Sequence, residues 1–285
     1  MSELSTIRDK LWSGSINIKL KLNPKDSKNQ ADIHYYYLSI NRNQYLYSRL
    51  IEIVLYFKSN LLIPEWCKNL QQFWFETTDE NIPVKWNYPI GLSYDLLNLH
   101  NKRQQHWELT MNCRNYPKEY IIPIYHDSFN LDFLENYWIN QLKQACYVIN
   151  GSSKLVMNLS KDDVIRLWQS VLDHDYTAFN LITSKFINET QFGFRRIPIR
   201  IYLPSNVSDK VLQPLIKPTN EEGESSITIG LMLLNILPEL FSSGYKFAYP
   251  LSHGVLIPQD ATILDIFKLF MYIDGFLHIK IVIRE

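Results

Sequence analysis

The two ends of the chain show the same order of hydrophobic patterns. Residues Ile16–Leu22 alternate apolar and polar side chains without a break, which is typical of a strand with one face in a core. Turn-forming residues from Asn23 to Asn29 follow, and a helical spacing of apolar residues begins at Tyr45. The predicted strands are Ile16–Leu22, Ile33–Ile40, Phe73–Glu76, Val84–Trp86 and Trp107–Met111. The predicted helices are Tyr45–Leu62 and Leu92–Leu99.

The C-terminal third repeats this order with a different sequence. Residues Ile197–Leu203 alternate again, and Val211–Ile216 supplies a strand that can pair with them. Asp274 and Gly275 form a turn into a final alternating segment, Phe276–Ile283. The remaining predicted elements are helices over Ile227–Phe241, kinked or ended near Pro238, and over Ala261–Met271, and strands over Phe247–Tyr249 and Val255–Ile257. Two hairpins packed across a helix is the β-grasp order of ubiquitin, so we predict a ubiquitin-like domain at each end.

Between these ends, over residues 128–190, the hydrophobic period becomes that of helices. Ser128 is expected to cap the first helix, and Asn150 with Gly151 to end it, because both tolerate the left-handed conformation. Ser160 is expected to cap a second helix, and the segment Asp173–Asp175 a third. The apolar stripe of the first helix consists of Leu131, Leu134, Trp138, Leu142, Ala145, Cys146 and Ile149. The middle of the chain is therefore predicted to be helix-rich.

The composition describes a folded chain without an overall charge bias. Lys and Arg total 29, and so do Asp and Glu, so no global field attracts nucleic acid or an anionic membrane. Hydrophobic residues make up 46%, which excludes disorder as the main state. The first residues lack the apolar core of a secretory signal, and the longest apolar stretch, Ile227–Leu237, is about half a bilayer span. We therefore expect a soluble, intracellular protein.

The sequence carries none of the common cofactor or metal motifs. Neither GxGxxG nor GxxxxGK occurs, and no HxH or HxxxH pattern occurs either, so we expect no cofactor and no metal. The cysteines Cys67, Cys113 and Cys146 lack CxxC spacing, which argues against structural zinc and a disulfide framework. Cys146 falls on the apolar stripe near a helix C-terminus, which favours core packing over nucleophilic catalysis. Cys67 and Cys113 have no evident base in the sequence.

Three lysines are the candidate functional residues. Between Asn136 and Lys161 the charged residues are Lys143, Lys154 and Lys161, with no acid. Lys154 follows the turn Asn150–Ser153, which is expected to present it to solvent on a flexible loop. Like charges nearby favour the neutral, nucleophilic form of its amine, which suits an acceptor. With a pKa of about 10.4, only about one amine in a few thousand is neutral near pH 7, so another enzyme must supply activation.

Simpler interpretations of the same residues stay open at this point. On these residues alone an ordinary surface lysine is the favoured interpretation of Lys154, and the three lysines together are consistent with a weak contact to anionic lipid. Trp12 precedes the first strand, where a large aromatic side chain either closes the core or anchors a partner.

Six short segments, in order over nearly the whole chain, carry a family resemblance. They are Leu11–Gly14, Phe73–Glu76, Trp86–Gly91, Asn150–Lys154, Gly193–Pro198 and Asp274–Leu277. On these segments the chain resembles the autophagy-related protein 5 family, in its fungal form. The resemblance implies an α+β fold in which two ubiquitin-like β-grasp domains flank a helix-rich domain, with a short N-terminal helix. The expected boundaries are 1–13 for the N-terminal segment, 14–122, 123–191 and 192–285.

The resemblance also implies a non-catalytic role in autophagy. Lys154 is then the residue that takes the C-terminal glycine of the ubiquitin-like autophagy-related protein 12 in an isopeptide bond. The N-terminal helix of autophagy-related protein 16 binds a groove formed by the N-terminal segment and both ubiquitin-like domains, and Leu11, Trp12 and Gly14 match a segment near it. The complex acts like a ligase, promoting transfer of autophagy-related protein 8 to phosphatidylethanolamine. The chain is expected in the cytoplasm, recruited peripherally to the preautophagosomal structure membrane.

One further observation separates an acceptor from a modifier. A ubiquitin-like modifier is activated through a free C-terminal glycine, whereas this sequence ends Val282–Glu285 directly after a predicted strand. We therefore expect it to accept a modifier and not to be one.

Two rival functions come from other classes. A cysteine-dependent conjugating or deconjugating enzyme would use Cys146, which would have to be exposed with a lowered pKa. A membrane-surface adaptor would act through Lys143, Lys154 and Lys161 without conjugation.

Overall fold

The chain folds into two compact units. The computed structural model describes residues 3–31, 33–63, 65, 70–98, 105–124, 131–187, 193–204, 208, 210–219 and 225–284. One unit consists of Gly14–Trp138, and the other of Met1–Ser13 together with Ile139–Glu285. Each unit contains one β-sheet, and the second also contains the helices that carry Lys154.

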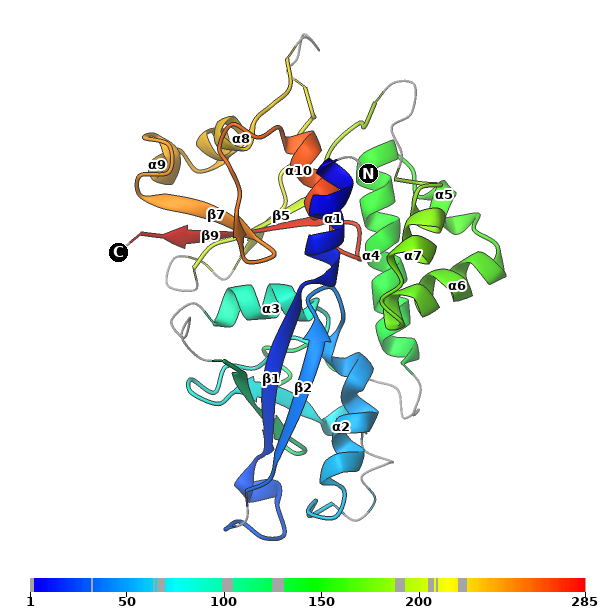
Figure 1. The fold of residues 1–285 in the computed structure, drawn as a ribbon, viewed down its shortest axis with the longest axis vertical. Coiled ribbons are helices and arrows are strands. Elements are labelled where there is room, and N and C mark those ends of the chain that lie inside the picture. The colour runs from blue at the N-terminus through cyan, green and yellow to red at the C-terminus, as the bar shows by residue number, and fades with distance from the viewer. Residues whose placement is uncertain are drawn as a thin grey trace. The chain divides into compact units, whose positions relative to one another are not determined.

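The unit Gly14–Trp138 is built on a four-stranded sheet of order β2-β1-β4-β3 (Figure 1). Strand β1 pairs antiparallel with β2 and parallel with β4. This arrangement, with the first strand beside the last, is the one expected for a β-grasp domain. The strands are β1 (Ser15–Leu22), β2 (Tyr35–Asn41), β3 (Trp74–Thr77) and β4 (Trp107–Asn112).

Alternation along β1 places its apolar side chains on one face. Ile18 and Leu20 are fully buried, whereas the intervening polar residues are exposed or half-buried. Helix α2 (Leu50–Phe57) buries Ile53 and Val54 in the same unit, because these neighbours lie on its apolar face. The other helices of this unit are α3 (Ile90–Leu97) and the 3-10 turns Pro24–Asp26, Leu46–Arg49 and Leu70–Gln72.

Three sequence predictions for this unit are wrong in detail. The helix predicted from Tyr45 to Leu62 is α2 preceded by a 3-10 turn, and Leu61 instead forms a β-bridge with Ser27. The second strand begins at Tyr35, two residues later than predicted. The segment predicted as a strand at Val84–Trp86 is not one: Pro83, just before it, forms an isolated β-bridge with Glu76, and the Val84 N–H donates to the Phe75 carbonyl at 2.8 Å.

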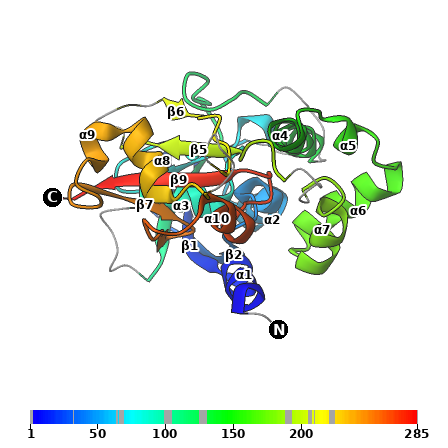
Figure 2. The same ribbon diagram turned by 90° about the horizontal axis from the view of Figure 1, so that it is seen from above.

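The second unit is built on a five-stranded sheet of order β6-β5-β9-β7-β8. Strand β9 lies in its centre, parallel to β5 and antiparallel to β7 (Figure 2). The predicted helix Ile227–Phe241 divides at Leu237 because Pro238 starts a new helix. The elements are β5 (Ile199–Tyr202), β6 (Val211–Leu212), α8 (Ile229–Ile236), α9 (Pro238–Phe241), β7 (Ala248–Ser252), β8 (Val255–Leu256), α10 (Ile263–Phe270) and β9 (Leu277–Ile283).

The helices α4 to α7 form the helix-rich part of the chain (Figures 1 and 2). The predicted caps of two of them are confirmed: the Ser160 hydroxyl accepts from the Asp163 N–H, and the Asp175 carboxylate accepts from the Ala178 N–H. Ser128, the predicted cap of α4, lies outside the described residues. These helices are α4 (Asp132–Asn150), α5 (Lys154–Met157), α6 (Lys161–Leu172) and α7 (Tyr176–Thr183), and α1 (Glu3–Ser13) lies beside α10.

A buried ionic cluster lies where α4 meets the second sheet. Arg200 of β5 lies 3.4 Å from the Asp274 carboxylate and donates to Gln141 Oε1 of α4 at 2.6 Å. Asp274 also lies 2.9 Å from His278 Nε2, and His278 Nδ1 bonds the Tyr202 hydroxyl at 2.8 Å. The alternation of β5 and β9 predicted polar faces at Arg200 and His278, but both side chains are buried by these partners.

Replacing Arg200 by methionine should destabilise the protein strongly. The change leaves the Asp274 carboxylate buried without its cation, which costs roughly 3 kcal/mol of unfolding free energy in comparable pairs. Lys185→Met is the matched control, because Lys185 forms an exposed ion pair with Asp163 at 2.8 Å and such pairs contribute little. Urea denaturation followed by circular dichroism measures both. Equal losses for the two variants would contradict the assignment of Arg200 to a buried, stabilising cluster.

Candidate acceptor site

Lys154 is the first residue of a single helical turn, α5, and its side chain is exposed. The Lys154 N–H donates to the Ser152 hydroxyl at 3.2 Å, and the buried Val156 attaches the turn to the core. The sequence predicted a flexible loop here, and that prediction is wrong. Residues 154–157 are too few to show a helical period in the sequence, and the turn is supported by the bond to Ser152 and by the burial of Val156.

The preceding turn is fixed by the C-terminus of α4. Gly151 has a φ of +75°, and its N–H donates to the Tyr147 carbonyl at 2.7 Å, as a residue that ends a helix does. The Asn150 side-chain amide donates to the Phe186 carbonyl at 2.9 Å, which ties the end of α4 to the segment after α7. The predicted termination of the helix at Asn150 and Gly151 is therefore confirmed.

Arg195 lies directly on this turn. Its main-chain N–H donates to the Ile149 carbonyl at 2.9 Å, and a Cβ placed on Gly151 would overlap its guanidinium. Glycine at position 151 is favoured by the left-handed backbone, and any larger residue would also have to displace the guanidinium of Arg195. Sequence reasoning identified the first reason but not the second, because Arg195 is far away along the chain.

The three lysines of the acid-free stretch lie on three different helices. Lys143 is on α4, about two turns before its end, and its amine donates to Asn140 at 3.3 Å. Lys161 begins α6 and is exposed, and the acids Asp162 and Asp163 follow it at once.

Exposed apolar side chains occur on α5 and near the end of α4. Leu155 is 47% exposed and Met157 is 64% exposed, both on α5, and Tyr147 of α4 is exposed as well. Exposed apolar side chains on the segment that carries the amine are suited to contact with another protein.

The described cysteines are not placed for nucleophilic chemistry. Cys146 is fully buried below the turn, and its thiol donates to the Ser152 carbonyl at 3.3 Å. Burial, reinforced by Asp26, raises the pKa of Cys113 to about 12. Cys67 lies outside the described residues.

Trp12 is buried inside its own unit. It is 5% exposed, its ring stacks on His174, and Tyr176 and Phe179 also contact it. The indole N–H donates to the His174 carbonyl at 3.1 Å, and His174 Nε2 donates to the Trp12 carbonyl at 2.7 Å. Burial lowers the pKa of His174, although the second bond acts in the opposite direction.

Trp12 therefore positions helix α1 and does not itself offer a free aromatic surface. Arg8 adds a second attachment, since its guanidinium donates to the Leu269 carbonyl at 2.6 Å. Leu11 and Gly14 are half-buried. Neither His174 nor Arg8 was predicted as a contact of α1, although the segment Asp173–Asp175 was predicted to cap the third helix.

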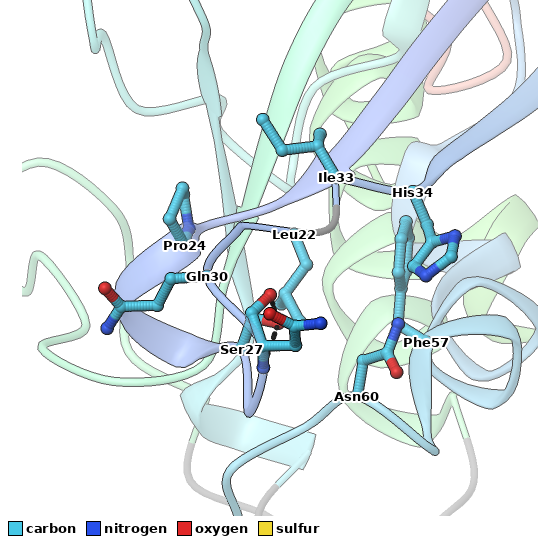
Figure 3. A pocket seen from close by; sticks show the side chains of 9 residues that line it. Leu22, Pro24, Ser27, Gln30, Ile33, His34, Phe57 and Asn60 are labelled. Atoms are coloured by element: carbon cyan, nitrogen blue, oxygen red, sulfur yellow. Dashed lines mark hydrogen bonds between the residues drawn. The ribbon is translucent and has the colours of Figure 1, made fainter.

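One small depression occurs away from these residues, at the turn after β1 (Figure 3). It is lined by Leu22, Pro24, Ser27, Asn29, Gln30, Ile33, His34, Phe57 and Asn60. Its Ser27 hydroxyl donates to the Asn29 carbonyl, so the depression is partly closed by its own hydrogen bonding. Within the described ranges, no group of three or more His, Cys, Asp or Glu side chains is arranged to hold a metal, and no helix is long and apolar enough to cross a membrane.

The two mixed sheets and the helical bundle define a protein with two ubiquitin-like domains and a helix-rich domain. Comparison with known families agrees. Residues 11–113 match the UblA domain of autophagy protein ATG5, residues 131–189 match its alpha-helical bundle region, and residues 196–281 match its UblB domain.

Similar proteins extend over the whole chain. Autophagy protein 5 of Pichia angusta is 36% identical over 97% of this chain and 96% of its own length. That of Scheffersomyces stipitis is 34% identical over 99% of both chains. The crystal structure of Kluyveromyces marxianus Atg5 superposes with a TM-score of 0.80 at 26% identity, over 97% of this chain and 99% of that one. The chain belongs to the autophagy protein 5 family, and this membership places it in autophagy.

Substituting Gly151 should disturb the turn before Lys154 more than an equivalent glycine substitution elsewhere. Gly151→Ala incurs the strain of a left-handed residue, about 1–2 kcal/mol, and must also displace Arg195. Gly193→Ala is the matched control, because Gly193 has a φ of +71° and a Cβ added to it would meet no described atom within 4 Å.

Thermal melts of both variants, and of Gly151→Ala combined with Arg195→Ala, measure the difference. We expect Gly151→Ala to lower the melting temperature further than Gly193→Ala, and truncation of Arg195 to remove the excess. An excess that persists without the Arg195 side chain would contradict this explanation.

Proposed function

We propose that the chain is a non-catalytic scaffold that is conjugated through Lys154 to the ubiquitin-like modifier autophagy-related protein 12. The observation that carries the proposal is the exposed amine of Lys154 at the start of a fixed helical turn. Its support from the sequence is the match of Asn150–Lys154 to the family. The covalent product is an isopeptide bond between the lysine amine and the C-terminal glycine of the modifier.

In this reaction the scaffold and the conjugating enzyme contribute different parts. The neutral Lys154 amine attacks the activated carbonyl of the modifier's glycine, carried as a thioester, and a C–N bond forms while the C–S bond breaks. The thiolate leaves, and the amine loses its extra proton to solvent or to a base on the conjugating enzyme. The scaffold contributes the position of the amine, because orientation removes much of the entropic barrier to such a transfer.

The exposed apolar side chains on α5 and near the end of α4 fit these separate roles. Leu155, Met157 and Tyr147 are exposed, whereas Val156 is the buried residue of α5. In the proposal they contact the modifier or the conjugating enzyme while the bond forms. The buried Cys146 gives no support to the rival cysteine enzyme.

The second proposed partner is the N-terminal helix of autophagy-related protein 16, bound near helix α1. Trp12 and Arg8 hold α1 on its own unit, which leaves Ile7 exposed on the free side of the helix. Of the residues predicted for this contact, Leu11 and Gly14 remain candidates for direct contact, and Trp12 contributes by positioning α1. The proposed complex acts like a ligase in the lipidation of autophagy-related protein 8, on the preautophagosomal membrane.

The proposed domain boundaries are those expected from the sequence, 1–13, 14–122, 123–191 and 192–285. The three family matches, at 11–113, 131–189 and 196–281, support a division into the same three domains.

Replacing Lys154 by arginine should abolish conjugation, because arginine keeps the charge and length but is not a usable nucleophile at neutral pH. The measurement is a denaturing gel after incubation with autophagy-related protein 12 and its activating and conjugating enzymes. Lys161→Arg and Lys143→Arg are the matched controls and should conjugate as wild type does. We expect at least a hundredfold loss of the heavier band for Lys154→Arg alone.

Two results would contradict the proposal in different ways. A full heavier band in Lys154→Arg would move the acceptor to another lysine. No band in wild type, with binding of vesicles containing anionic lipid that is lost in Lys143→Glu or Lys161→Glu, would favour the membrane-surface adaptor instead.

A further inference from the structure

Strand β2 is the one long open edge among the sheets described. The edge strands β6 and β8 of the second sheet have two residues each, and β3 is flanked by Pro83 and Val84. Strand β2 has seven residues and contains neither proline nor a charged residue. Proteins usually protect such edges with proline, lysine or a covering segment, because unpaired main-chain groups recruit other strands.

Alternate residues of β2 direct their main-chain groups away from the sheet. Arg42, just after β2, donates its N–H to the carbonyl of Gly14, just before β1. The main-chain N–H and C=O groups of the even-numbered residues of β2 therefore point toward β1. The odd-numbered residues face outward, as two contacts confirm: the Tyr56 hydroxyl donates to the Tyr35 carbonyl at 2.9 Å, and the Asn41 N–H donates to Gln44 Oε1 at 3.3 Å.

The two ends of this outer edge are thus closed, and its middle is open. The Tyr35 carbonyl is hydrogen-bonded by Tyr56, and both the N–H and the C=O of Asn41 are hydrogen-bonded by Gln44. Between them, the outward N–H and C=O groups of Tyr37 and Ser39 have no hydrogen-bond partner in the described part of the chain, and both residues are exposed. Four main-chain groups on alternate residues match the bonding pattern of one short added strand.

The surfaces on the two sides of this edge differ in character. Lys21 and Lys19 lie opposite Tyr35 and Tyr37 in the β1–β2 register, so their side chains share the outer face. Lys19 lies 4.2 Å from the Tyr35 ring centre, and the Glu108 carboxylate lies 3.0 Å from the Lys19 amine. The acids of this face, Glu108 on β4 and Glu76 on β3, lie one and two strands further from β2 than the lysines of β1, so the charges nearest the open edge are positive.

The opposite side is largely apolar, and the one carboxylate there, that of Glu52, accepts from the Tyr36 hydroxyl and is paired with Arg49. Tyr56 packs against the ring of Tyr36 and is 49% exposed, and Leu55 of the same helix is 43% exposed. In an added strand, every second side chain would lie against Leu55 and Tyr56, and the side chains between them would lie beside Lys19 and Lys21.

We propose that the open edge of β2 binds an extended segment of a partner protein, with acidic side chains on the face of Lys19 and Lys21 and apolar side chains on the face of Leu55 and Tyr56. The main-chain groups of Tyr37 and Ser39 supply the hydrogen bonds, and the alternating side chains supply the selectivity. This interaction is independent of Lys154 and of the conjugation proposed above.

The test uses the full-length, ¹⁵N-labelled protein and a blocked heptapeptide that alternates glutamate and valine. Amide NMR signals of Tyr37 and Ser39 should shift on titration, and a lysine–valine peptide of the same length should bind at least tenfold more weakly. Equal binding of the two peptides would overturn the acidic partner. Shifts of the same signals on raising the protein concentration without peptide would assign the edge to a second copy of this chain.

Ser39→Pro and Ser39→Ala form the matched pair of variants. Proline removes the outward N–H without touching the β1 ladder, whereas alanine keeps the N–H and removes only the hydroxyl. We expect the affinity of Ser39→Pro to fall at least tenfold and that of Ser39→Ala to equal that of wild type. Equal binding by both variants would overturn the proposal.

A change in the peptide gives a test that does not depend on how the proline variant folds. In one peptide the main-chain nitrogen of every glutamate is methylated, and in the other peptide that of every valine is methylated. One of the two should lose binding, and which one does so reports whether the strand adds antiparallel or parallel. Unchanged binding of both would overturn the proposal, because an added strand must use one set of N–H groups.

Discussion

The position of helix α4 depends on the neutralisation of one buried cation. Arg200 leaves β5 into a region without solvent, and Asp274, from the turn before β9, supplies the opposite charge. Burial raises the pKa of Asp274, but His278 and Arg200 outweigh it, so the pKa is lowered and the carboxyl group stays ionised. Helix α4 completes the cluster through Gln141, and Gly275 lets the turn approach Ala145, where a Cβ would come within 2.7 Å.

This junction fixes the part of the chain that ends at Lys154. Helix α4 is held against the second sheet, and two hydrogen bonds hold its last residues. The Asn150 side chain donates to the Phe186 carbonyl, and the Arg195 N–H donates to the Ile149 carbonyl. Lys154 then begins α5 in a defined place, shortly beyond the end of α4. An acceptor lysine on a fixed support requires less ordering when another protein binds it, and that reduces the entropic cost of the encounter.

Local signals in the sequence predicted the local features of this arrangement. Ser160 and Asp175 act as caps because side-chain oxygens bond main-chain groups three residues away, and Gly151 ends α4 because of its own backbone freedom. The burial of Trp12 and Arg200 was not predictable in the same way, since their partners, His174 and Asp274, lie far along the chain. The turn α5 was missed because four residues are too few to show a helical period, and its support from Ser152 and the buried Val156 is visible only in the structure.

The central claim is that Lys154 carries the modifier, and peptide mass spectrometry of the chain purified from autophagy-induced cells tests it most directly. The proteolysed wild-type protein should yield a branched peptide in which the C-terminal residues of autophagy-related protein 12 are joined to the ε-amine of Lys154. A branch at another lysine, or a fully unmodified Lys154 peptide beside a conjugate-sized band, would contradict the account.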